Sequence, residues 1–127
     1  MTQDKDKKLI AIIEDDEVLL KLLKEQLEKA GYEVITAIDG VKGLELVRSK
    51  KPDLLLLDII IPRKDGFQVL SELKKENIIP ALPVVVVSNS GQPVEIDRAI
   101  NLGVRDYLIK LNFNPYEVLE KIKKILG

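Results

Sequence analysis

Residues 53–61 read D-L-L-L-L-D-I-I-I, an apolar run with one aspartate, Asp58, inside it. A short run that is apolar on both faces is typical of a strand buried in a parallel sheet. Pro62 and the pair Asp65-Gly66 then predict a loop, and apolar residues at helical spacing follow over residues 67–73. This stretch therefore predicts a buried parallel strand, a loop and a covering helix, with a carboxylate at the end of the strand.

The same unit repeats on both sides of this stretch. Apolar or β-branched runs predict further strands, and helical periodicity predicts a helix after each strand. The strands are expected over residues 9–13, 32–37, 53–61, 84–87 and 105–109, and the helices over 18–30, 41–51, 67–73, 93–102 and 114–126. Short connections between alternating strands and helices predict an α/β fold with a five-stranded parallel sheet, covered on both faces, in the order 2-1-3-4-5.

Single residues mark the ends of several predicted helices. Asp16 is expected to cap the helix over 18–30, and Gly31 stands where that helix should stop. Pro93 fits the first turn of the fourth helix, and Asn114 is expected to cap the last one.

Length and composition limit what the protein can be. The 127 residues, 46% hydrophobic and 32% charged, fit one globular domain over residues 1–127. Lysine plus arginine (20) nearly balance aspartate plus glutamate (21), so no basic excess points to direct nucleic-acid binding. The absence of cysteine and histidine excludes thiolate and imidazole chemistry. The sequence contains no apolar run long enough for a membrane span and begins with a polar segment, so we expect a cytoplasmic protein without a membrane partner.

Polar residues follow several of the predicted strands. In an open parallel sheet the ligand site lies beyond the carboxyl ends of the strands, near the point where strand order reverses. Glu14 and Asp15 follow the first strand, Asp58 the third, Ser88 the fourth and Lys110 the fifth. Clustered carboxylates repel one another unless a cation compensates them. Oxygen-only ligands favour Mg²⁺, with Mn²⁺ as an alternative.

A metal ion, a lysine and a hydroxyl together can neutralise the oxygens of a phosphoryl group. An aspartate can attack phosphorus and hold the group as an aspartyl phosphate. Asp58, at the centre of the cluster, is the candidate nucleophile.

The motifs at these strand ends carry a resemblance. They read I-I-E-D-D at 12–16, L-L-D-I-I-I-P-R-K-D-G at 56–66, V-V-V-S at 85–88 and D-Y-L-I-K at 106–110. With these motifs the chain resembles the receiver domain of bacterial two-component response regulators, in the single-domain form of chemotaxis and sporulation regulators. The resemblance covers residues 8–126 and implies a flavodoxin-like doubly wound (βα)5 fold.

What the resemblance implies about the site can be carried over residue by residue. Asp58 would accept a phosphoryl group from the phosphohistidine of a histidine kinase or phosphotransfer protein. Asp15, Asp58 and the backbone carbonyl of Ile60 would bind Mg²⁺, with Glu14 acting through water. The protein would then be a signalling switch rather than an enzyme, catalysing its own phosphotransfer and slow self-dephosphorylation.

The resemblance also implies a readout. Ser88 and Lys110 would contact the attached phosphoryl group, and Tyr107 would swing inward as Ser88 moves. The face built from the fourth helix, fifth strand and fifth helix would change. A downstream protein, or an output domain outside this sequence, would recognise that face.

Two residues depart from the family pattern. Leu111 follows Lys110 where proline is usual, so a trans bond and a less well aimed lysine are expected. Asn89 replaces the usual small residue after Ser88 and could crowd the phosphoryl pocket or donate a hydrogen bond there. Both changes are expected to alter phosphorylation or dephosphorylation rates.

Three other functions are compatible with parts of the pattern. A haloacid-dehalogenase-type phosphatase shares an aspartate nucleophile and Mg²⁺ but needs a general acid two residues later, where this chain has Ile60. A flavin mononucleotide module needs a phosphate-binding loop after the first strand, where Glu14 and Asp15 would repel phosphate. A phosphorylation-independent binding module of receiver shape is the third alternative, which the changes at Asn89 and Leu111 support.

Overall fold

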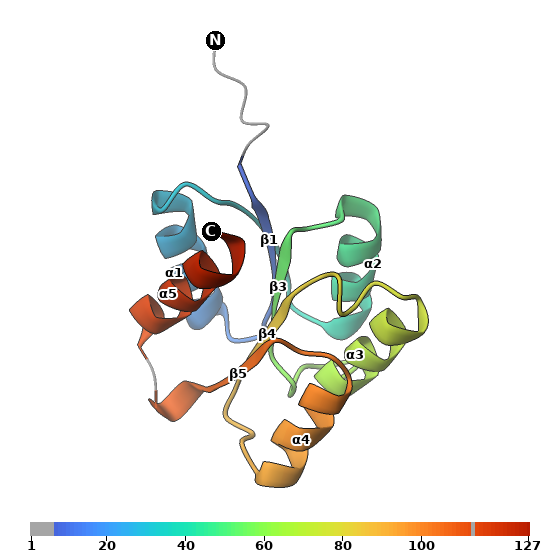
Figure 1. Ribbon diagram of the computed structural model, residues 1–127. Helices are drawn as coiled ribbons and strands as arrows, with labels where there is room; N and C mark the ends of the chain where they lie inside the picture. Colours follow the sequence, from blue (N-terminus) through green and yellow to red (C-terminus); the bar gives the residue numbers. More distant parts are fainter. Residues whose placement is uncertain (1–6, 113) are drawn as a thin grey trace.

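Five parallel strands and five α-helices alternate in the computed structural model, which describes residues 7–112 and 114–127 (Figure 1). The strands form one sheet in the order β2-β1-β3-β4-β5, which confirms the predicted order and the doubly wound fold. The strands are β1 (Leu9–Ile13), β2 (Glu33–Ala37), β3 (Leu54–Leu57), β4 (Val84–Ser88) and β5 (Asp106–Ile109). The helices are α1 (Glu17–Lys29), α2 (Gly40–Lys50), α3 (Gly66–Lys75), α4 (Pro93–Asn101) and α5 (Pro115–Leu126).

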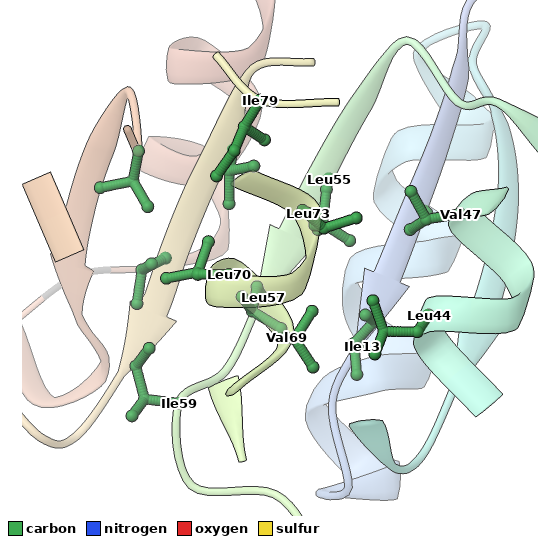
Figure 2. Packing of buried hydrophobic residues seen from close by; sticks show 14 of the residues in the cluster. Ile13, Leu44, Val47, Leu55, Leu57, Ile59, Val69, Leu70, Leu73 and Ile79 are labelled. Carbon is green, nitrogen blue, oxygen red and sulfur yellow. The ribbon is translucent and has the colours of Figure 1, made fainter. Parts of the chain in front are cut away.

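The sheet separates two apolar layers. Helices α1 and α5 cover one face, and α2, α3 and α4 cover the other (Figure 1). Successive residues of a strand point to opposite faces, so Ile12 and Leu56 pack toward α1 and α5, while Ile13 and Leu57 pack toward α2 and α3. Figure 2 shows this second layer, in which Leu44 of α2 lies beside Ile13 and Leu70 of α3 lies over the sheet.

Side-chain caps begin most of the helices, and the two that the sequence predicts, Asp16 and Asn114, are confirmed. Asp16 accepts hydrogen bonds from the amides of Val18 and Leu19, and Asn114 accepts from the second and third residues of α5. Asp65 begins α3 with a reciprocal capping box to Gln68. These caps satisfy amide groups at the helix starts and fix where the loops beside the sheet edge end.

The third strand is shorter than the sequence predicts. The apolar run to Ile61 suggested a strand over 53–61, but β3 ends at Leu57 and the last bond to β1 runs from the Asp58 amide to the Ile13 carbonyl (3.0 Å). Beyond Ile13 the chain leaves β1 and leads to the N-cap of α1, so it offers β3 no further backbone hydrogen-bond partner. Residues 59–61 therefore form a loop, and Asp58 lies at the strand end, as predicted.

None of the helices in the described part of the chain is long and apolar enough to cross a membrane.

Candidate functional site

Asp58 is held at the C-terminal edge of the sheet with both carboxylate oxygens engaged. The residue is 5% exposed. Its Oδ1 accepts a hydrogen bond from the Ile60 amide (3.2 Å), and its Oδ2 accepts one from Lys110 Nζ (2.8 Å). The carboxylate is thereby fixed in direction before any ligand arrives.

Close packing of the following loop explains why glycine stands at position 66. A Cβ atom there would lie 2.6 Å from Ile59 Cα and 2.7 Å from the carbonyl oxygen of Asp58. The Gly66 amide also donates to the Ile59 carbonyl (2.7 Å). The backbone that carries Asp58 is therefore pressed against the start of α3, which only glycine permits without a shift.

Glu14 and Asp15 follow β1 at the same edge. Glu14 is 2% exposed, and its Oε1 lies 2.8 Å from Lys110 Nζ while its Oε2 accepts from the Asp16 amide (3.0 Å). Asp15 is exposed. Asp16 faces away as the cap of α1, as predicted.

The three carboxylates at this edge fit a hard cation. One oxygen from each of Glu14, Asp15 and Asp58 lies within 4.8 Å of the others. All three donors are oxygens, which suits Mg²⁺ or Mn²⁺ rather than a softer metal. The structure thus brings together the acidic side chains that the sequence predicted, and the backbone of Ile60 lies beside them through its bond to Asp58.

The cluster perturbs its own titration. Burial raises the pKa of Glu14 to about 7, against the lowering effect of its bonds to Lys110 and to the Asp16 amide, with the Asp58 charge adding to the rise. Burial lowers the pKa of Lys110, but its hydrogen bonds to Asp58 and Glu14 outweigh burial and hold that pKa above its usual value. Lys110 therefore stays charged and compensates the two buried acids.

The departure at Leu111 leaves the lysine well aimed. The bond between Lys110 and Leu111 is trans, as predicted, since Ile79–Pro80 is the one cis peptide bond of the described residues. The expectation that Lys110 is therefore less well aimed is wrong, because its Nζ lies 2.8 Å from both Asp58 and Glu14. Lys110 begins a 3₁₀ turn that sends Leu111 outward, 82% exposed, while the long flexible stem of the lysine reaches the site.

Ser88 and Tyr107 meet at the neighbouring strand ends. Ser88 closes β4, fully buried, and its Oγ accepts a hydrogen bond from the Ser90 amide (3.2 Å). Tyr107 of β5 is half-buried, and its hydroxyl donates to the Ser90 carbonyl. Asn89 is exposed between them.

Sequence reasoning missed two residues of this region, Ser90 and Glu95. The Ser90 hydroxyl donates to Glu95 Oε2, and Glu95 Oε1 accepts from the Gln92 amide (3.1 Å). A signal was present, because Gln92, Pro93 and Glu95 form the pattern of a capping box at a helix start.

A doubly wound five-stranded sheet with an acidic cluster and a lysine at its C-terminal edge places the chain among the flavodoxin-like α/β domains. Within that class the chain belongs to the response regulator receiver domain family, which matches residues 10–123.

Individual relatives agree with this family. The chain is 34% identical over 119 residues to the alkaline phosphatase synthesis transcriptional regulatory protein PhoP of Bacillus subtilis, covering 94% of this chain and 48% of that protein. It is 36% identical over 117 residues to the DNA-binding dual master transcriptional regulator RpaA of Synechocystis, covering 92% and 48%. The chain thus spans about half the length of the curated relatives it matches.

Solved structures share the fold closely. The CheY-like response regulator receiver domain protein of Methanospirillum hungatei superposes with a TM-score of 0.87 at 32% identity, covering 94% of each chain. The phosphorylated cyanobacterial phytochrome response regulator RcpA gives a TM-score of 0.80 at 32% identity, covering 94% of this chain and 91% of that one.

Proposed function

We propose that this chain is a phosphoacceptor switch in which Asp58 receives a phosphoryl group from the phosphohistidine of a histidine kinase or phosphotransfer protein. The observation that carries the proposal is the Asp58 carboxylate, buried at the strand end, paired with Lys110 and grouped with Glu14 and Asp15. Membership of the receiver family supports the same role.

The transfer balances without any further reactant. A carboxylate oxygen of Asp58 attacks phosphorus, the bond from phosphorus to the donor imidazole nitrogen breaks, and the imidazole leaves with a proton from solvent. The product is a mixed anhydride on Asp58. Water later attacks phosphorus, which releases inorganic phosphate and restores the carboxylate.

Residues already in place would hold the metal. Asp15, Asp58 and the backbone carbonyl of Ile60 would bind Mg²⁺ directly and Glu14 through water. When bound, Mg²⁺ supplies positive charge that offsets the carboxylates and the phosphoryl oxygens. The negative acidic cluster would otherwise repel an incoming phosphoryl group.

Lys110 and Ser88 would stabilise the phosphorylated state. Lys110 already lies 2.8 Å from Asp58 Oδ2, so it can shift its hydrogen bond to a phosphoryl oxygen without crossing the site. The Ser88 hydroxyl would donate a hydrogen bond to the phosphoryl group from the end of the adjacent strand. These contacts exist in one state alone and therefore shift the balance between two conformations of the β4–α4 loop.

The readout would be the face formed by α4, β5 and α5, with Tyr107 following the loop. A downstream protein, or an output domain beyond this sequence, would recognise that face, and a cytoplasmic location remains our prediction. Two matched relatives are transcriptional regulators by name, about twice as long as this chain.

One of the two changes that favoured a phosphorylation-independent binding module no longer favours it. A poorly aimed lysine favoured a module that works without phosphorylation, but Lys110 contacts Asp58 directly. Asn89 remains as a departure, and it is exposed. The phosphatase alternative still finds Ile60 at the position of the required acid.

The test is intact mass after incubation with acetyl phosphate, with and without Mg²⁺. We expect one hydroxylamine-labile phosphoryl group that requires Mg²⁺ and is absent from Asp58→Asn. Asp97→Asn, which removes an exposed carboxylate of α4, is the matched control and should still be modified. Absence of any mass increase in the original chain would contradict the proposal, and continuous turnover of free phosphate esters would favour the phosphatase.

A further inference from the structure

Helix α4 is attached to the sheet more weakly than α3 on the same face. Five residues of α3 are buried, whereas among the residues of α4, all of them described, Ala99 alone is buried. Apolar burial is the main force that holds a helix against a sheet. The position of α4 therefore depends more on polar contacts than the position of α3 does.

One set of polar contacts lies at the start of α4. The Ser90 hydroxyl donates to Glu95 Oε2, and Glu95 Oε1 accepts from the Gln92 amide (3.1 Å). Glu95 thereby ties the β4–α4 loop to the first turn of the helix. We call the Ser90–Glu95 hydrogen bond the loop clasp.

Ser90, the serine of the loop clasp, also accepts a hydrogen bond from Tyr107. The Tyr107 hydroxyl donates to the carbonyl oxygen of Ser90, and the Ser90 amide donates to Ser88 Oγ (3.2 Å). Ser90 therefore uses its amide toward the switch serine, its carbonyl toward the tyrosine and its side chain toward Glu95. If the loop moves, all three contacts move together.

Electrostatics agree with this geometry. Burial and, second, the charge of Glu95 raise the pKa of Tyr107, while the neighbouring Ser88 hydroxyl lowers it. The phenol thus lies within the field of Glu95 and beside Ser88.

We propose that Glu95 is a positioning residue that, through Ser90, holds the β4–α4 loop in the conformation that accepts Tyr107 before any phosphoryl group is attached. The inference rests on the proposed function, because it concerns the balance between the two conformations of the β4–α4 loop before phosphorylation. The unphosphorylated protein then already populates the state with Tyr107 inward. Phosphorylation then needs to shift the balance between the two loop conformations by less.

Reciprocity gives the proposal a second consequence. A ligand that prefers the conformation with Tyr107 inward binds more weakly when that conformation is less populated. Its apparent affinity falls in proportion to the population of that conformation. Removal of the loop clasp should therefore weaken binding of a phosphoryl mimic at Asp58, although Ser90 and Glu95 need not touch the mimic.

The experiment follows Tyr107 by ¹⁹F NMR in the full chain labelled with 3-fluorotyrosine. The chain has three tyrosines, so the resonance missing from Tyr107→Phe identifies Tyr107. Spectra are recorded with Mg²⁺ alone and with Mg²⁺ plus beryllium fluoride, a tetrahedral mimic of the phosphoryl group. The variants are Ser90→Ala, Glu95→Ala, Glu95→Gln and the Ser90→Ala/Glu95→Ala pair.

Each variant tests a separate contact. Ser90→Ala removes the hydroxyl but keeps the carbonyl that accepts from Tyr107 and the capping of α4 by Glu95. Glu95→Gln keeps an acceptor for the Gln92 amide and a polar partner for Ser90, so it should partly rescue the effect of Glu95→Ala. Asp97→Asn removes an equal charge from the exposed side of the same helix and is the control.

We expect Ser90→Ala to move the unliganded Tyr107 resonance away from its liganded position and to weaken beryllium fluoride binding roughly three- to tenfold, the range of the net contribution of one ordinary hydrogen bond. The double variant should show no larger change than either alanine variant alone. Asp97→Asn should match the original chain.

Two results would overturn the inference. One is a Tyr107 resonance that stays unchanged in Ser90→Ala, and the other is an equal displacement by Asp97→Asn. Failure of the proposed function is tested separately, by measuring the intact mass after incubation with acetyl phosphate. If no variant accepts a phosphoryl group, the unliganded Tyr107 resonances still decide whether the loop clasp holds the tyrosine.

Discussion

The strands that carry the acidic cluster and the strand that carries Tyr107 differ in how deeply they are buried. β3 is buried along its whole length, as is β1 beyond its first residue, whereas every residue of β5 is only half-buried. The helices repeat this contrast, since α3 buries five residues and α4 one. Asp58, the proposed acceptor, thus stands at the deeply buried centre of the sheet, and Tyr107 stands on its weakly packed end.

This difference has a physical consequence for a switch. A site that must hold a metal and a nucleophile in register gains from a support that does not move. A segment that must change conformation has to come from the less stable part of the fold, where few apolar contacts are lost on moving. Burial therefore divides the chain into a receiving part and a responding part, and the following predictions probe that division.

The largest effect is expected from matched core truncations in the two parts. Leu56 of β3 is fully buried and Leu108 of β5 is half-buried against the same apolar layer. We expect Leu56→Ala to reduce the free energy of unfolding by about 2–5 kcal/mol, and Leu108→Ala by markedly less, because less apolar area is lost there. Urea unfolding measures both, and equal losses would remove the distinction between the two parts.

Glycines in the two loops give a second matched pair. A Cβ at Gly66 would meet the backbone of Asp58 and Ile59, whereas a Cβ at Gly91 would meet the end of the Ile109 side chain at 2.3 Å, which can rotate. We expect Gly66→Ala to cost about 1–3 kcal/mol of stability, as overpacking usually does, and to impair phosphorylation of Asp58. Gly91→Ala should cost less and leave acceptance intact. A larger loss for Gly91→Ala would show that the β4–α4 loop is the stiffer one.

Between about pH 6 and 8 the acidic cluster should respond to pH while Tyr107 stays neutral. The pKa of Glu14 is about 7, so its carboxyl takes up a proton as pH falls through that value, and we expect Mg²⁺ affinity to fall by up to about tenfold per pH unit below it. Calorimetry in two buffers of different ionisation enthalpy should show proton release on Mg²⁺ binding. Glu14→Gln should abolish the release, and its persistence in that variant would assign the proton to another group.

The same shift affects stability without metal. The folded state holds the Glu14 proton more tightly than the unfolded state, whose pKa is about 4.5. The contribution of Glu14 is therefore fully present below about pH 4.5 and is lost as pH rises toward 7, and Mg²⁺ should offset that loss.

Sequence patterns predicted the buried centre better than its ends. Strand order, the caps at Asp16 and Asn114, and the meeting of Glu14, Asp15 and Asp58 all follow from local periodicity and parallel topology. The end of β3 did not, because residues 59–61 are as apolar as the strand and only the turn of β1 removes their partner.

The aim of Lys110 and the contact of Ser90 with Glu95 could likewise not be predicted from the sequence, although the capping-box pattern places Glu95 in the first turn of α4. The first depends on the path of a 3₁₀ turn, and the second joins a serine to a glutamate across a proline. Neither contact has a periodic signature, since both depend on how a particular loop folds back. The responding part of the chain is therefore the part that the sequence describes least.

The smallest effect we predict is on the ionisation of Tyr107. Burial raises its pKa first and the Glu95 charge second, so Glu95→Gln should lower that pKa while leaving it above the ordinary value of a tyrosine. Near-ultraviolet absorbance follows the phenolate, and Tyr107→Phe identifies its share of the signal. Asp97→Asn carries the same charge change on the same helix and should shift the pKa of Tyr107 less, because the Asp97 charge is not among the causes that raise this pKa. An equal shift in both variants would mean that Tyr107 responds to the net charge of α4 rather than to a carboxylate held beside Ser90, and the responding part would then lack a defined contact between helix and strand.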